Sequence, residues 1–224
     1  DEWLARITEE LAAYDRALLT GSDLENAWLG RGNVFENLRR YGEAVAAYDR
    51  ELSINADLAE AWFGCGNVFQ NLNRQDDAFV SYDKAFALKP DLADLEGSRL
   101  TSKMSLCNWE NVTGEIEHLM HSIRSGKPHC PPFAMLALSD SPEDHLLCAR
   151  SWASTKYPQS DNPLWTGGKS AHEKIRIGYV SADFHEHATA YLMAEMFELH
   201  DKSRFEVSGI SLGPSGDSPM RQRL

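Results

Sequence analysis

The chain has no apolar run approaching the roughly 18 residues that a membrane span requires, which excludes an integral membrane protein. Cysteine is scarce. There are four, none in a CxxC or other paired spacing, which argues against a zinc ribbon or a disulfide framework. No basic-then-apolar leader opens the chain. These absences predict a cytoplasmic protein whose cysteines are reduced.

Basic residues are also in short supply. The 22 Lys and Arg residues are outnumbered by 34 Asp and Glu residues, which gives a net charge of −12. Because an acidic surface repels phosphate groups, this balance argues against nucleic acid and against an anionic membrane as partners.

Self-similarity organises the first half of the chain. Residues 23–56 align with residues 57–90 without a gap, and 15 of the 34 positions are identical. The matched pairs include Trp28 with Trp62, Gly32 with Gly66, Phe35 with Phe69, Ala44 with Ala78, and Tyr48 with Tyr82. A W…G…F…A…Y pattern at a 34-residue period is typical of tetratricopeptide (TPR) repeats.

The repeats predict a solenoid of paired helices over residues 1–105. Asp23, Asp57 and Asp91 recur at the start of each repeat, and their carboxylates are predicted to cap the first helix. The small glycines are predicted to let helices approach closely, and the aromatic side chains to fill the space between hairpins. The third repeat loses its signature after Leu95. Helices are expected at about 2–19, 25–38, 41–54, 58–71, 75–88 and 93–105.

A TPR solenoid presents a concave groove, which is a candidate binding surface for protein segments. By the pattern of TPR repeats, the first helix of each repeat is expected to place amide side chains toward this groove, where they could hydrogen-bond an extended peptide backbone. The alternative is that they are solvated amides on a helix surface. The candidate residues are Asn33, Asn37, Asn67 and Asn71.

Residues 106–157 are predicted to be a connecting helical region, with one helix in 106–125 and another over 142–157 capped by Asp140 or Ser141. His118 and His121 are predicted to lie on the helix surface, because the sequence places no further metal ligands near them. Proline, glycine and polar residues then concentrate in 158–172, which is typical of a linker.

The hydrophobic pattern changes after this linker. Residues 174–182 alternate like a strand, 189–199 are predicted to form a helix, and 205–212 a second strand. This order predicts the opening β-α-β unit of a parallel, Rossmann-like sheet over 173–224. Ligands of such sheets bind beyond the carboxyl ends of the strands. No G-x-G-x-x-G follows the first strand, so a dinucleotide fingerprint is absent.

The segment at that strand end, SADFHEHA at 181–188, is dense in titratable side chains. A metal site built on the H-x-H pair lacks evident further ligands. A nucleophilic Ser181 lacks the G-x-S-x-G elbow. Contact with phosphate or sugar, through the helix that starts near Thr189, is a third possibility, and simple capping of that helix is a fourth. The titratable residues are Asp183, His185, Glu186 and His187.

Several stretches together carry a family resemblance: the TPR repeats, Cys107-Asn108-Trp109, RIGYVSADFHEHATAYLM at 176–193, and FEVSGISLGPSGDSPMRQRL at 205–224. They resemble the protein O-linked N-acetylglucosamine transferase family, in particular its bacterial SPINDLY-like branch. The resemblance implies an inverting, metal-independent, cofactor-free glycosyltransferase of the two-lobed GT-B type. Such an enzyme moves a sugar, usually GlcNAc from a UDP-sugar donor, to Ser or Thr of acceptor proteins that the TPR groove recruits.

The family's D-F-x-x-H-x-T segment can be carried over residue by residue. It implies that His187 lies in the active site as the catalytic candidate, and that Asp183 and Thr189 bind substrate. The sequence departs from the family pattern in three respects. Ala188 stands where proline is frequent, Tyr191 where a second histidine occurs, and glycines stand at positions 30 and 64, where the best-known family superhelix has asparagines.

The resemblance also sets expectations for the chain as a whole. It ends at Leu224, before most of the two lobes that the family possesses, so we expect an N-terminal fragment that is inactive alone. The alternative is a TPR protein–protein interaction module whose α/β segment does no chemistry.

Overall fold

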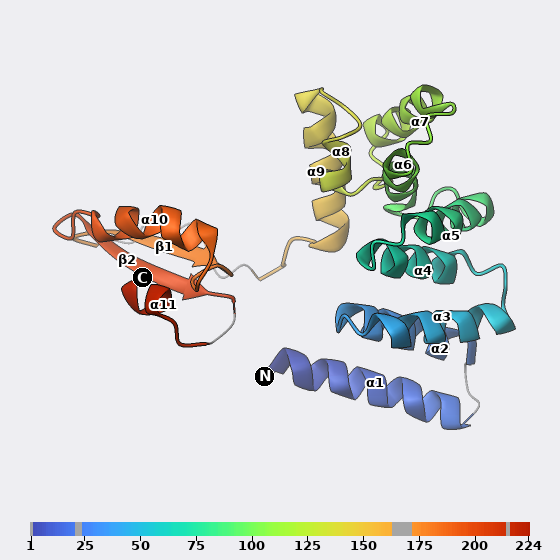
Figure 1. The fold of residues 1–224 in the computed structure, drawn as a ribbon, viewed down its shortest axis with the longest axis horizontal. Helices are drawn as coiled ribbons and strands as arrows, with labels where there is room; N and C mark the ends of the chain where they lie inside the picture. The colour runs from blue at the N-terminus through green and yellow to red at the C-terminus, as the bar shows by residue number, and fades with distance from the viewer. Residues whose placement is uncertain (1, 21–23, 163–171, 214–215) are drawn as a thin grey trace. The chain divides into compact units, whose positions relative to one another are not determined.

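The computed structural model describes residues 2–20, 24–162, 172–213 and 216–224, and the chain forms two compact units, Asp1–Ser160 and Asp161–Leu224 (Figure 1). Among the described residues, the regular elements of the first unit are all helices, and the second unit pairs two strands with two helices. The predicted fold class, a helical solenoid followed by a β-α-β unit, is therefore confirmed. No described helix is both long and apolar enough to cross a membrane.

The helices of the first unit agree closely with the ranges predicted from the repeat. Helices α2 with α3 and α4 with α5 pack as hairpins, and successive hairpins stack on one another (Figure 1). Helices α7, α8 and α9 form the connecting region and pack against α6 or one another. The bounds are α1 Glu2–Thr20, α2 Leu24–Asn37, α3 Tyr41–Ile54, α4 Ala59–Asn71, α5 Gln75–Leu88, α6 Leu95–Ser105, α7 Val112–Arg124, α8 Pro132–Met135 and α9 Pro142–Lys156.

The predicted aspartate caps are wrong at both positions that the structure describes. Leu58, not Asp57, is the N-cap of α4, and the Asp57 backbone N–H donates to Asn55 Oδ1 at 3.2 Å. Asp94, not Asp91, is the N-cap of α6, with a left-handed φ of 66°. Its N–H donates to the Pro128 carbonyl at 2.8 Å, so the loop before α8 fixes where α6 begins. Asp23 lies outside the described residues.

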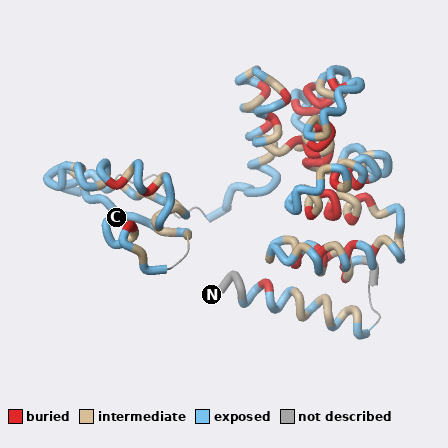
Figure 2. The backbone as a smooth tube through the Cα atoms, in the orientation of Figure 1, coloured by how far each residue is buried: buried red, intermediate tan, exposed pale blue. Residues whose placement is uncertain are grey.

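The core of the repeats is built on tyrosines held between glycines. Tyr48 of α3 is fully buried, and a Cβ added at Gly32 or at Gly64 would lie 2.4 Å from its ring. One period later Tyr82 of α5 is also fully buried, and a Cβ at Gly66 would lie 2.4 Å from that ring. The glycines therefore allow α2 and α4 to pack directly against the tyrosine rings. Figure 2 shows buried residues along the packed helices of the repeats.

The tryptophans contribute less to this core than the repeat signature suggests. Trp28 and Trp62 are only half-buried. The Trp62 indole N–H donates to the Ala56 carbonyl at 2.9 Å, and the Lys84 ammonium lies 4.0 Å from the centre of its ring system. The tryptophans thus lie at the periphery of the hairpin core, with part of each indole ring still accessible to water.

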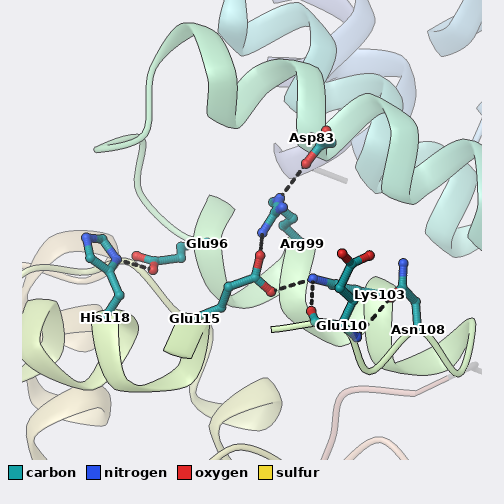
Figure 3. A network of polar contacts seen from close by, with 8 residues as sticks. All are labelled: Asp83, Glu96, Arg99, Lys103, Asn108, Glu110, Glu115 and His118. Atoms are coloured by element: carbon teal, nitrogen blue, oxygen red, sulfur yellow. Dashed lines mark hydrogen bonds and ion pairs between the residues drawn. The ribbon is translucent and has the colours of Figure 1, made fainter. Parts of the chain in front are cut away.

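A chain of charged side chains ties the repeats to the connecting region (Figure 3). Arg99 of α6 donates to Asp83 of α5 at 2.7 Å and to Glu115 of α7 at 3.0 Å. Lys103 of α6 donates to the same Glu115 carboxylate at 2.8 Å and to the Glu110 carbonyl at 2.6 Å. The two cations are largely buried, so each needs these oxygens to offset its loss of water. Helix α6 therefore belongs to both parts of the unit.

The connecting region has a core and a cap of its own. Apolar side chains from α6 to α9 form one cluster that includes Leu100, Leu119, Ile123 and Met135. Of the two predicted caps for α9, Ser141 is the one used: its hydroxyl oxygen accepts a hydrogen bond from the backbone N–H of α9's third residue at 3.2 Å.

The second unit is a parallel two-stranded sheet with two helices. Strand β1 (Ile175–Ser181) pairs with β2 (Phe205–Ser211) in the register Ile175↔Phe205 through Ser181↔Ser211. Helix α10 spans Ala188–Glu198 between the strands, and the short α11 spans Pro219–Arg223. The predicted strand, helix and strand are confirmed. Most of the predicted linker, 163–171, lies outside the described residues.

Candidate functional site

The carboxyl ends of both strands meet at one corner of the second unit. The Leu212 backbone N–H donates to the Ser181 carbonyl at 2.9 Å, which extends the parallel pairing just past β2. A Cβ on Gly213 would lie 1.8 Å from the Ala182 carbonyl oxygen. Only glycine permits this approach of two backbones, so the loops that follow β1 and β2 lie side by side.

The structure brings together Asp183, His187 and Thr189, the three residues predicted for this corner. Ser181 Oγ accepts a hydrogen bond from the Asp183 backbone N–H at 3.0 Å, which turns the chain directly after β1. His187 is the N-cap of α10, and its Nδ1 accepts from the Thr189 N–H at 3.2 Å. Asp183 Oδ2 lies 3.6 Å from the same Nδ1. One ring nitrogen thus faces a backbone donor and a carboxylate.

A small apolar cavity lies beneath this corner. Its volume is about 150 Å³, and Asp183 and Thr189 line it together with Phe184 and Met193. His187 itself is 45% exposed. The polar atoms of the corner therefore stand at the surface over an apolar floor, an arrangement suited to an accessible ligand rather than to a sealed core.

Sequence reasoning missed a second set of contacts at the same edge. The Tyr191 hydroxyl donates to Glu186 Oε2, and Glu186 Oε1 accepts from the Met220 N–H at 3.0 Å. These two hydrogen bonds, the one from Tyr191 first, lower the pKa of the Glu186 carboxyl. Tyr191, which departs from the family's histidine, thus links α10 to α11 through Glu186.

Arg221 places a guanidinium at this edge, and sequence reasoning did not single it out. Its Nη1 donates to Ser211 Oγ at 3.2 Å and to the Phe184 carbonyl at 3.4 Å. The sequence does hold a signal for the helix that carries it, because Ser218 followed by Pro219 is a typical helix start. Ser218 Oγ accepts from the Arg221 N–H at 3.2 Å.

Of the alternatives left open for this loop, capping of the helix is observed, because the His187 ring accepts a hydrogen bond from the Thr189 N–H. His185 and His187 have ring centres 5.7 Å apart in an edge-on arrangement. Within 2–20, 24–162, 172–213 and 216–224, no three His, Cys, Asp or Glu residues are grouped to hold a metal ion. In the connecting region, His118 Nδ1 lies 2.6 Å from Glu96 Oε1, which gives that histidine a structural partner.

The amides predicted for the groove are partly engaged with the core tyrosines. The Tyr48 hydroxyl lies 2.8 Å from Asn33 Oδ1 and 2.9 Å from Glu36 Oε2. The Tyr82 hydroxyl lies 2.9 Å from Asn67 Oδ1 and 3.0 Å from an oxygen of Gln70. These contacts fix the polar face of α2 and α4. That this face binds a peptide stays a prediction.

The two remaining asparagines are exposed, as is Asn33. Asn71 Nδ2 donates to the Asn67 carbonyl within its own helix at 2.9 Å, and Asn37 is exposed. Glu36 joins the two repeats. Burial raises the pKa of its carboxyl, against the smaller lowering effect of hydrogen bonds from Tyr48 and Asn67. Asn67 thus contacts both the Tyr82 hydroxyl and Glu36 of the preceding repeat.

Comparison with known proteins agrees with this division of the chain. Residues 25–58 and 59–92 match the tetratricopeptide repeat family, and residues 159–224 match glycosyl transferase family 41. The chain resembles the protein O-GlcNAc transferases. A TPR solenoid and a glycosyltransferase segment thus occur in one polypeptide, as the residue motifs imply.

Individual relatives support the same likeness. A probable UDP-N-acetylglucosamine–peptide N-acetylglucosaminyltransferase SEC of Arabidopsis thaliana is 27% identical over 134 residues, which cover 53% of this chain and 14% of that protein. The UDP-N-acetylglucosamine–peptide N-acetylglucosaminyltransferase of Caenorhabditis elegans is 40% identical over 52 residues, covering 23% of this chain and 4% of that protein. The chain therefore spans a small part of the length of these relatives.

A solved structure shares the fold. A mutant O-GlcNAc transferase of Thermobaculum terrenum aligns with 89% of this chain and 39% of its own, at a TM-score of 0.53 and 21% identity.

Proposed function

We propose that the protein carrying this chain transfers N-acetylglucosamine, or a related sugar, from a UDP-sugar to Ser or Thr hydroxyls of other proteins. The observation that supports this most is the occurrence of TPR repeats and a family 41 segment in one chain, with Asp183, His187 and Thr189 gathered at the carboxyl end of β1. In parallel α/β sheets this is the end where ligands bind.

Each part of the chain has a proposed role. The inner face of the repeats recruits acceptor proteins, with Asn33, Asn37, Asn67 and Asn71 as candidate contacts. His187 touches the reacting substrates, and Asp183 and Thr189 bind substrate beside it. Transfer is proposed to invert the sugar's anomeric configuration and to take place in the cytoplasm.

Neither a metal ion nor a cofactor is expected to take part. Treatment with EDTA should leave turnover unchanged. Inhibition by EDTA that a divalent metal reverses would contradict this expectation and return attention to His185 and His187.

We expect residues 1–224 alone to lack transferase activity. Two strands form at most part of one wall of a two-walled cleft, and holding donor and acceptor together can supply about 7–11 kcal/mol of barrier reduction. Calorimetric titration of the purified chain with UDP and UDP-GlcNAc should show no binding. Micromolar binding would mean that the nucleotide site lies within these residues.

The decisive experiment uses the protein encoded by the full reading frame. It is incubated with several UDP-sugars and candidate acceptor proteins, and modified Ser or Thr residues are identified by mass spectrometry. His187→Ala should lower turnover by about 10²–10⁴-fold if the imidazole transfers a proton and by about tenfold if it only holds substrate. Capture of acceptor proteins without transfer of any sugar would favour an interaction module instead.

A further inference from the structure

The short helix α11 is anchored on α10 by one apolar and one charged contact. The Met220 side chain is buried in a cluster with Ala190 and Ala194, whose small side chains leave room for it. The Arg223 guanidinium donates two hydrogen bonds to the Glu198 carboxylate, at 2.7 and 3.0 Å. Helix α11 therefore has a defined place beside the helix that begins at the candidate site.

From this place α11 holds the loop that joins β1 to α10, residues 182–187, at two points. Arg221 Nη1 donates to the Phe184 carbonyl at 3.4 Å and to Ser211 Oγ at 3.2 Å, which ties the loop to the end of β2. The Met220 backbone N–H donates to Glu186 Oε1 at 3.0 Å. Because the first N–H groups of a helix have no acceptor within it, Glu186 supplies one that α11 lacks.

Glu186 fastens the loop to α10 as well. The Tyr191 hydroxyl donates to Oε2, so the two carboxylate oxygens contact two different helices. The hydrogen bond from Tyr191, followed by that from the Met220 N–H, lowers the pKa of this carboxyl, which favours the charged form that accepts at both oxygens. One side chain thus connects the loop, α10 and α11.

The residues held in this way alternate with the residues of the candidate site. Phe184 directly follows Asp183, and Glu186 directly precedes His187. Asp183 lies just after β1, whereas His187 is the N-cap of α10, so the loop between them decides whether the two side chains meet. Their separation, 3.6 Å between Asp183 Oδ2 and His187 Nδ1, therefore depends on how the loop is held.

We propose that Glu186 and Arg221 are positioning residues of the transferase, which brace this loop from α11 and so keep Asp183 and His187 together where substrate is bound. The proposal rests on the proposed function, because it takes Asp183 and His187 to contact substrate. Neither positioning residue needs to touch substrate itself. Because misplacing a group by about 1 Å can cost about 10²-fold in rate, loss of the brace should be visible in turnover.

The first test measures turnover of the full-length enzyme. Glu186→Ala and Arg221→Ala should each lower turnover by about tenfold or more, because each removes two side-chain hydrogen bonds of the brace. Glu186→Gln should stay close to the original, because its amide can still accept from the Met220 N–H and bond to the Tyr191 hydroxyl. Unchanged turnover in Glu186→Ala, or equal losses in Glu186→Gln and Glu186→Ala, would overturn the proposal.

Gln222 supplies the matched control. It is exposed on the same helix, and its side-chain amide donates at 3.0 Å to Asp217, which lies outside the loop. Gln222→Ala should therefore keep the original turnover. A loss in Gln222→Ala as large as that in Arg221→Ala would mean that any change in α11 is harmful, and would overturn the assignment to the two bracing residues.

A double-mutant cycle distinguishes positioning from general damage to the fold. In a His187→Ala background the brace has lost one of the groups that it positions, so Glu186→Ala should lower the residual turnover by a clearly smaller factor than in the original enzyme. Damage to the fold would instead lower turnover by the same factor in both backgrounds. Equal factors in the two backgrounds would therefore overturn the proposal.

The brace itself is tested in residues 1–224, independently of any transfer. Nuclear magnetic relaxation of the backbone ¹⁵N atoms should give order parameters of about 0.85 over residues 182–187 in the original chain and in Gln222→Ala, and below about 0.6 in Glu186→Ala and Arg221→Ala. A loop that stays rigid in the last two variants would overturn the proposal. Absence of transfer with every UDP-sugar from the full-length enzyme would refute the proposed function instead, so the two failures are distinguishable.

Discussion

The contact between Gly64 and Tyr48 can be tested quantitatively. A Cβ at Gly64 would lie 2.4 Å from Cζ of Tyr48 and 2.8 Å from Cε1 and Cε2, whereas carbon atoms prefer about 3.5–4.0 Å. The ring cannot retreat easily, because Gly32 also approaches it closely and its hydroxyl is hydrogen-bonded. Gly64→Ala should therefore carry an overpacking penalty of about 1–3 kcal/mol.

Gly42 of α3 supplies the matched control. A Cβ at Gly42 would meet nothing within 4 Å, so Gly42→Ala should only gain the helix propensity of alanine, up to about 1 kcal/mol. Gly64→Ala receives a similar gain, and the difference between the two variants isolates the overpacking penalty. Gly42→Ala is expected to be the more stable by about 1–3 kcal/mol.

The assay is urea unfolding of residues 1–224 followed by helical circular dichroism, with the urea dependence of the unfolding free energy compared between variants. In a Tyr48→Leu background the ring is gone, so Gly64→Ala should no longer destabilise the protein. Equal stability of Gly64→Ala and Gly42→Ala in the original background would refute the packing of Tyr48 between two glycines.

Two further predictions concern hydrogen bonds in the first unit. Tyr48→Phe removes a hydroxyl that is hydrogen-bonded to the Glu36 carboxyl and should cost about 1.5–3 kcal/mol of unfolding free energy. Tyr82→Phe removes a hydroxyl that is hydrogen-bonded to side-chain amides and should cost about 0.5–1.5 kcal/mol. Urea unfolding of both variants tests whether Tyr48→Phe is the more destabilising. The pKa of Glu96 lies below its ordinary 4.5, because hydrogen bonds with His129 and His118 together outweigh the opposing effect of burial. Its stabilisation is therefore present above pH 4.5 and is lost as the pH falls below it, and Glu96→Gln should flatten that part of the stability profile; an unchanged acid limb would contradict the assignment.

The helices of the repeats could be predicted because many positions agree on one period. Their caps could not, because a distant loop decides where α6 begins: the Asp94 N–H donates to Pro128, which no local pattern reveals. At the candidate site, strand alternation placed Asp183 and His187 at the carboxyl end of β1. The link from Glu186 to the Met220 N–H joins segments 34 residues apart, and nothing in either segment alone indicates it.

The third repeat shows how a periodic fold can outlast its sequence signature. Counting 34 residues on from Gly66 leads to Leu100 of α6, and from Tyr82 to Ile116 of α7. Where the earlier repeats pair a glycine with a buried tyrosine, this one pairs two aliphatic side chains within a single apolar cluster. Leu100 on the first helix occupies space that glycine leaves open in the earlier repeats, so Ile116 on the second helix can stand where those repeats have the larger tyrosine. Arg99 and Lys103 of α6 add ion pairs to Glu115 of α7, which join these two helices (Figure 3). The loss of the repeat signature after Leu95 therefore marks a change in which side chains fill the core between the helices, and the helical stack continues.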